Sequence, residues 1–149
     1  MVQLVEMSHE NYLIWQERLW VSYFDELIMA GYTEAAAHEN IEATKRENMP
    51  DGKLAANNFV FNVASGESNV GVVWLFQQIN QWFIYDIEVY ENFRGQGFGR
   101  QTMKAIEAYA RANGAESISL SVFGFNETAR KLYETEGYQT MRLSMKKTL

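Results

Sequence analysis

The stretch YDIEVYENFRGQGFGRQTMKAIEAYA, residues 85–110, decides the fold because it joins a strand, a glycine-rich turn and an amphipathic helix. The turn is Arg94-Gly95-Gln96-Gly97-Phe98-Gly99. The first amides of a helix have no partner within the helix, and they carry the positive end of the helix dipole. Glycines let the chain bend tightly and let a phosphate approach the backbone, and Arg94 adds a fixed positive charge. The stretch therefore predicts a site for a phosphorylated ligand.

Two common phosphate-binding motifs do not fit this turn. A P-loop has a Lys-Ser/Thr pair after its last glycine, whereas Gly99 is followed by Arg100-Gln101. A dinucleotide-binding fingerprint needs a third glycine, and Arg100 stands at that position. The pattern that fits is Arg-x-x-Gly-x-Gly, at Arg94, Gly97 and Gly99. It resembles the pyrophosphate-binding motif of the GNAT acetyltransferase superfamily.

A second motif follows one helix and one strand later. After the apolar strand predicted over Ser117–Phe123 comes NETARKLYETEGY, residues 126–138. Asn126 suits the N-cap of a helix and Gly137 suits its C-terminal stop. A strand followed by N-x-x-A-x-x-x-Y-x-x-x-G-Y is similar to the other half of the GNAT core. The resemblance is specific over residues 82–147, and residues 1–81 match it only in the order of their elements.

The resemblance implies an α/β (α+β) GNAT fold. Its central sheet is mixed and mostly antiparallel, with about six to seven strands flanked by about four helices. The strands on either side of the helix Arg100–Asn113 should run parallel and splay apart at their C-terminal ends. The remaining expected elements are helices over 9–30 and 33–48, an edge strand Val2–Met7, strands near 59–63, 70–78 and 82–90, and one or two closing strands over Tyr138–Met145. We expect one domain over residues 1–149.

The composition is typical of a soluble globular protein, with 47% hydrophobic and 21% charged residues. The chain has no cysteine, which excludes disulfides, thiolate metal sites and a cysteine nucleophile. Two isolated histidines are too few for a metal site. No apolar run approaches the length of a membrane span, and the first residues lack the features of a signal peptide. We therefore expect a cytoplasmic protein with no metal and no membrane contact.

The charge is divided unevenly along the chain. Residues 1–90 contain 4 Lys/Arg and 13 Asp/Glu, whereas residues 91–149 contain 9 Lys/Arg and 6 Asp/Glu. The basic half holds the phosphate turn. The acidic half should repel nucleic acid and attract a cationic substrate, although solubility alone would also explain an acidic excess. We expect the acceptor to be a cation that binds against the N-terminal half.

The resemblance also implies acetyl-coenzyme A as the co-substrate and assigns residues to its parts. The pantetheine arm should pair with the backbone of Ile87 and Val89, and the amide of Val89 should face the thioester oxygen. Asn126 should both cap its helix and contact the pantetheine or phosphate region. The residues expected at the pyrophosphate are Arg94, Gly95, Gln96, Gly97, Phe98, Gly99 and Arg100.

Three side chains are the candidates for proton transfer. The phenol of Tyr133, with an ordinary pKa of about 10, stays protonated at neutral pH and can donate to the departing thiolate. Packing is the alternative role for Tyr133. Asp86 and Glu88 alternate onto one face of their strand beside the thioester site, so either can take the proton of the incoming amine. An ion pair or a backbone hydrogen bond is the alternative for each carboxylate.

The resemblance implies an enzyme that moves an acetyl group to a primary amine by direct attack within a ternary complex. Polyamines, amino sugars, peptide N-termini and lysine side chains all remain open as acceptors. The alternative is a non-catalytic module that holds acyl-CoA as a sensor. The intact Tyr133 and the carboxylates beside Val89 favour the enzyme. A homodimer and the use of other acyl groups are left open.

Overall fold

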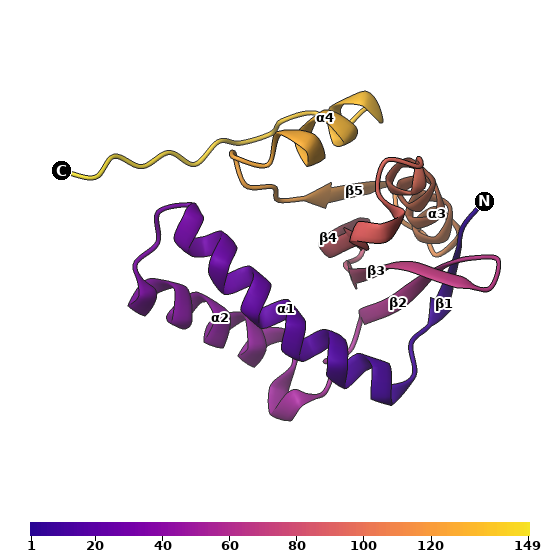
Figure 1. The fold of residues 1–149 in the computed structure, drawn as a ribbon, viewed down its shortest axis with the longest axis horizontal. Helices are drawn as coiled ribbons and strands as arrows, with labels where there is room; N and C mark the ends of the chain where they lie inside the picture. The colour runs from indigo at the N-terminus through magenta and orange to yellow at the C-terminus, as the bar shows by residue number, and fades with distance from the viewer.

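The computed structural model describes residues 1–149 as a five-stranded sheet with four α-helices around it (Figure 1). The strand order is β1-β2-β3-β4-β5, and every neighbouring pair is antiparallel except β4 and β5. The elements are β1 (Gln3–Glu6), α1 (His9–Met29), α2 (Glu34–Asn48), η1 (Pro50–Gly52), β2 (Asn58–Ser65), β3 (Ser68–Gln77), β4 (Gln81–Val89), η2 (Glu91–Phe93), α3 (Phe98–Ala112), β5 (Ser117–Leu120) and α4 (Glu127–Thr135).

Side chains that alternate along the central strands build one hydrophobic cluster on each face of the sheet. On one face, Leu75 of β3 belongs to the cluster that contains Ile106 of α3. On the other face, Trp74 belongs to the cluster that contains Trp15 of α1, and the two indole rings meet edge to face at 5.7 Å. A third cluster joins α1 to α2. The sheet is thus covered by α1 on one side and by α3 on the other (Figure 1).

The parallel pair β4–β5 separates because β4 changes its register. The pairing of β4 with β3 shifts at Tyr85, which is left as an extra residue on β4. β5 pairs with β4 only as far as Ile84↔Leu120. From there β4 continues to Val89 without a partner on this side. The predicted parallel pairing is confirmed, and the two strands part directly at the bulge.

Two predictions about the C-terminal part are wrong. The strand expected over Ser117–Phe123 ends at Leu120, because β4 bulges away at the next residue. The segment Tyr138–Met145 forms no strand, so the sheet has five strands instead of the predicted six to seven. Residues 139–149 are exposed and extend away from the molecule (Figure 1). Their alternating pattern therefore has no partner strand within this chain.

Local signals explain the helix boundaries. Ser8, Thr33 and Asn126 each accept a hydrogen bond at 3.2 Å from the amide three residues later, as N-cap residues do. Because of these caps, α1, α2 and α4 begin at the next residue in each case. None of the helices combines the length and the apolar character that crossing a membrane requires.

Candidate functional site

The glycine-rich turn between β4 and α3 presents free backbone donors to solvent. Gly95 and Gly97 have φ values of 75° and 85°, the left-handed region that favours glycine. Gly97 is the N-cap of α3 and provides no side-chain cap. The first backbone bond of the helix runs from Gln101 N–H to Gly97 O at 3.2 Å, so the amides of residues 98–100 have no partner in the helix. These donors and the helix dipole favour the binding of an anion here.

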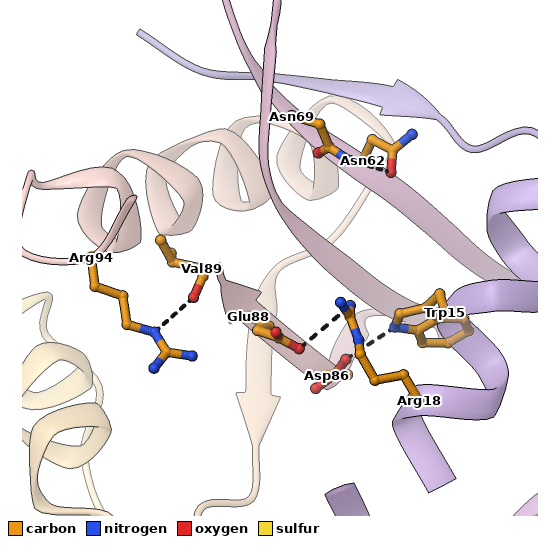
Figure 2. A network of polar contacts seen from close by, with 8 residues as sticks. All are labelled: Trp15, Arg18, Asn62, Asn69, Asp86, Glu88, Val89 and Arg94. Atoms are coloured by element: carbon orange, nitrogen blue, oxygen red, sulfur yellow. Dashed lines mark hydrogen bonds and ion pairs between the residues drawn. The ribbon is translucent and has the colours of Figure 1, made fainter. Parts of the chain in front are cut away.

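Basic side chains flank the turn, but they are not equally free. The exposed Arg94 donates from Nε to Val89 O at 2.9 Å, which fixes the guanidinium beside the turn and leaves its other donors unused (Figure 2). The side chain of Arg100 pairs instead with Glu136, at 3.3 Å between Nε and Oε2. Gln96 donates from Nε2 to Asn92 O at 3.3 Å. Arg94 is therefore the cation that is available to an anion here, and Arg100 offers its backbone amide.

The unpaired edge of β4 carries backbone groups that point into the gap left by β5. Tyr90 N–H donates to Val70 O at 2.9 Å, toward β3. Because the backbone groups of successive strand residues point to opposite sides, the N–H and C=O of Val89 point away from β3. The N–H of Ile87 points the same way. The bond from Arg94 to Val89 O agrees with this direction (Figure 2). An extended ligand can pair with this edge as a further strand would.

Asp86 lies next to this edge and faces α1. Trp15 Nε1 donates to Asp86 Oδ2 at 3.3 Å (Figure 2). Burial raises the pKa of Asp86 from 3.8 to about 7, and the negative charges of Glu88 and Glu26 add to the rise. The bond from Trp15 and the charge of Arg18 act in the opposite direction. This carboxyl group can therefore change its protonation near neutral pH.

Glu88 shares the face of Asp86, as the alternation of the strand predicts, but its surroundings differ. Its Oε2 lies 3.7 Å from an Nη of Arg18, in an ion pair whose side chains are 35% and 46% exposed. The guanidinium of Arg18 also lies 5.0 Å from the centre of the Tyr90 ring. Glu88 is thus a solvated, paired carboxylate, and Asp86 is the more deeply desolvated of the two.

Tyr133 lies on α4 and is partly buried. Burial raises its pKa from 10.0 to about 12, and the negative charges of Asp86 and Glu26 add to the rise. The Tyr133 hydroxyl has no hydrogen-bond partner within the chain. Its ring packs 6.1 Å from that of Tyr138 and contacts the main cluster. The ring of Tyr133 therefore contributes to packing, and its hydroxyl is free to hydrogen-bond a ligand.

Sequence reasoning missed the polar contribution of α1. Trp15 is 3% exposed and belongs to the core, yet it also donates to Asp86. Arg18 is the only Lys or Arg among residues 1–44, which was an available signal for a special position. Nothing in the local pattern singled out Glu26. Burial raises the pKa of Glu26 and the charge of Glu88 adds to the rise.

The sequence matches the Acetyltransferase (GNAT) family over residues 14–138, and the chain belongs to this family. The match begins within α1 and takes in α2, the glycine-rich turn and the motif that contains α4. Members of the family use acyl-coenzyme A, so an acyl-CoA is the ligand to test against the turn.

Two curated relatives come from Bacillus subtilis strain 168, and both are described as uncharacterized N-acetyltransferases. YdgE is 30% identical over 98% of this chain and 97% of its own length. YycN is 29% identical over 99% of each chain. The crystal structure of YycN is similar with a TM-score of 0.90, covering 100% of this chain and 99% of YycN. AAC(6')-Iy shares the fold, with a TM-score of 0.62 and 14% identity over 100% of this chain and 99% of its own.

The observed turn fits the phosphates of an acyl-CoA. No atom lies within 4 Å of the position that a Cβ would take at Gly95 or Gly97, so the approach to the free amides is open. Arg94 provides a cation at the same place. Asn126 is the N-cap of α4, and its Oδ1 is engaged by Ala129 N–H. No group of three or more His, Cys, Asp and Glu side chains in the chain is arranged to hold a metal ion.

Proposed function

We propose that the protein transfers an acetyl group from acetyl-CoA to a primary amine of a small cationic molecule, by direct attack within a ternary complex. One observation carries this proposal. The open edge of β4 runs from a helix start with free amides to Asp86, whose charge raises the pKa of Tyr133 on α4. The structure of AAC(6')-Iy holds a bisubstrate analogue, CoA-S-monomethyl-acetylneamine, which supports an acyl-CoA and an amine as the ligands of this fold.

The amides of residues 98–100 and the guanidinium of Arg94 bind the pyrophosphate in this proposal. The edge amide of Ile87 pairs with the pantetheine arm. The amide of Val89 donates to the carbonyl oxygen on which negative charge develops during attack. Bound acetyl-CoA supplies the activated acetyl group. Asn126 orients the start of α4 beside the same gap, because its side chain caps the helix that carries Tyr133.

Asp86 is the base that we assign to the acceptor amine. A lysine-like amine with a pKa of about 10.4 is only about 0.1% neutral at pH 7.4, which costs about 4 kcal/mol unless the site removes the proton. A carboxylate with a pKa of about 7 is well matched to that task at neutral pH. Glu88 is the second candidate, and its pairing with Arg18 favours a role in attracting the amine.

Tyr133 donates to the sulfur of the departing thiolate. With a pKa of about 12 it stays protonated throughout the neutral range. The negative charge of Asp86 is one cause of that high pKa. When Asp86 accepts a proton from the amine, this contribution disappears and Tyr133 becomes a stronger acid. The two groups are therefore coupled in the direction that the reaction needs.

The release of free thiol from acetyl-CoA across a panel of amines tests the proposal. Polyamines, amino sugars and lysine peptides should support turnover. At least one of Asp86→Asn and Glu88→Gln should lower kcat, by about 10²- to 10⁴-fold for a general base. Glu67→Gln, in the β2–β3 turn, is the control and should leave kcat unchanged. Binding of acetyl-CoA without turnover on any amine would support the sensor alternative.

A further inference from the structure

The β5 edge of the sheet lacks a strand. β5 pairs with β4 on one side, and the strand order ends with β5, so its other side has no partner. A hollow of about 290 Å³ opens at the start of this edge. Its lining combines the end of α3, the first residues of β5 and the segment Glu136–Tyr138. Unpaired strand edges offer a row of donors and acceptors to another extended segment.

The C-terminal segment Gln139–Lys146 has the pattern of a strand but no partner. Its apolar residues Met141, Leu143 and Met145 recur at every second position and alternate with polar residues. These side chains are 86%, 74% and 90% exposed. Such an alternation is typical of a strand with one buried face. Within a single chain this face is bare.

The position at which the segment leaves the molecule is fixed. Tyr138 donates from its hydroxyl to Glu107 Oε2 at 3.2 Å and from its amide to Tyr133 O at 2.9 Å. After Tyr138 the chain extends away from the sheet and passes beyond α1 and α2 (Figure 1). Within residues 139–149, Lys146 donates from Nζ to Gly31 O at 2.7 Å, in the turn between these helices. The segment is therefore directed away from the β5 edge of its own chain.

We propose that two copies of this chain exchange their C-terminal segments, and that Gln139–Lys146 of each copy adds as a strand to the β5 edge of the other. Each copy has one unpaired strand edge, at β5, and one unpaired segment, Gln139–Lys146. In a two-fold symmetric dimer, the segment of each copy pairs with the β5 edge of the other, and no edge or segment is left for a third copy. The exchange hides the apolar side chains of the segment and completes the backbone bonds of β5. It also accounts for the strand that the sequence pattern predicts and that the single chain does not form.

Mass in solution gives the first test. The parent protein at micromolar concentration should have twice the chain mass of 17.2 kDa. The double variant Met141→Asp, Leu143→Asp should weaken self-association by about 100-fold or more, because charge then enters the buried face of the added strand. Ile79→Asp is the matched control, since Ile79 is 94% exposed in the β3–β4 turn, and it should stay dimeric. A monomeric parent, or a double variant that remains dimeric, overturns the proposal.

Cross-linking tests the exchange itself. Because the chain has no native cysteine, only the introduced cysteines can react. The variants Arg142→Cys, in the segment, and Ser121→Cys, after β5, are mixed and treated with a flexible bis-maleimide. Exchange predicts a covalent species of two different chains. The double variant Ser121→Cys, Arg142→Cys should likewise give chains linked in pairs. A cross-link formed within one chain would show that the segment folds back onto its own β5, which overturns the proposal.

Discussion

The two ends of the gap beside β4 are built by different means. At one end, a contiguous turn binds through backbone amides, and its shape depends on glycines with positive φ. At the other end, the polar groups are side chains from α1, β4 and α4, and Trp15 bonds to Asp86 across 71 residues of sequence. Backbone amides do not titrate, whereas Asp86, with a pKa of about 7, changes its charge near neutral pH. Substitutions and pH should therefore act differently on the two ends.

Gly97→Glu should have the largest effect, and it should act on the backbone-built end alone. The substitution brings bulk and negative charge to the open space above the free amides. Losing two charge-assisted hydrogen bonds, each about 1.5–3 kcal/mol, would weaken acetyl-CoA binding by about 10²- to 10⁴-fold. Acetyl-CoA should raise the melting temperature of the parent and not of the variant.

The control for this prediction is Gly114→Glu, at the other end of α3. Gly114 has a φ of 94°, close to the 85° of Gly97, and open space around it as well. Both variants carry a similar backbone strain of about 1–2 kcal/mol. Only Gly97→Glu should lose the response to acetyl-CoA. Equal loss in both variants would assign the effect to strain in α3 rather than to the phosphates.

Asp86→Asn should increase the stability of the protein above neutral pH, because it removes a buried negative charge from the side-chain-built end of the site. The folded-state pKa of Asp86 is raised to about 7, so the native state holds a proton that the unfolded state loses above about pH 4. The contribution of Asp86 to stability is thus complete below that pH and is lost as pH rises to 7. At pH 8 the neutral variant should be more stable than the parent, by on the order of 3 kcal/mol.

Denaturant unfolding of both proteins at pH 5 and pH 8 measures this difference. The advantage of Asp86→Asn should grow with pH, because the asparagine keeps the bond from Trp15 without the buried charge. Glu88→Gln is the control, since Glu88 is a partly exposed and paired carboxylate, and it should bring no such gain. A pH-independent difference for Asp86→Asn would remove the basis for assigning Asp86 as the base.

Tyr133→Phe should lower kcat by about 10²-fold and leave the affinity for acetyl-CoA nearly unchanged. The hydroxyl has no partner within the chain, so its loss should not unfold the site. Tyr138→Phe is the matched control. It removes the bond to Glu107 instead and should cost stability without changing kcat. An unchanged kcat for Tyr133→Phe at saturating substrate would leave Tyr133 with its packing role alone.

The backbone-built end could be predicted from the sequence because its determinants are local. The positions of Gly95 and Gly97 fix the chain direction before a helix, and Asn126 marks the start of α4 by its own side chain. The order of elements and the parallel pairing of β4 with β5 follow from the same local patterns. The resemblance to a family then gave the remaining topology.

The rest could not be predicted because it depends on tertiary placement. The donor from Trp15 to Asp86 appears only when α1 lies on the sheet, and periodicity shows Trp15 simply as a core residue. Likewise, the pattern of Gln139–Lys146 is typical of a strand, yet the segment forms no strand, because a pattern cannot say whether a partner strand exists in the same chain. The early end of β5 at Leu120 follows from a bulge in another strand.

The smallest expected effect concerns the approach of the acceptor, and it tests whether the acidic half contributes to function. For a cationic amine, kcat/KM should fall roughly tenfold as salt rises, which is the low end of the effect that charged clefts have on capture. The attraction is screened within about 8 Å at physiological ionic strength. An amine that is neutral at the working pH should show no such fall. Acetyl-CoA binding at the basic turn can be measured separately, by the melting shift, at each salt concentration.

Glu26→Gln sharpens this test, because the charge of Glu26 raises the pKa of both Asp86 and Tyr133. The variant should have a weaker salt dependence than the parent. Glu67→Gln, equal in charge change but located in the β2–β3 turn, should keep the parent's dependence. If both variants behave alike, the attraction comes from net charge and not from the site. If neutral or acidic amines are the better substrates, the acidic half serves solubility alone.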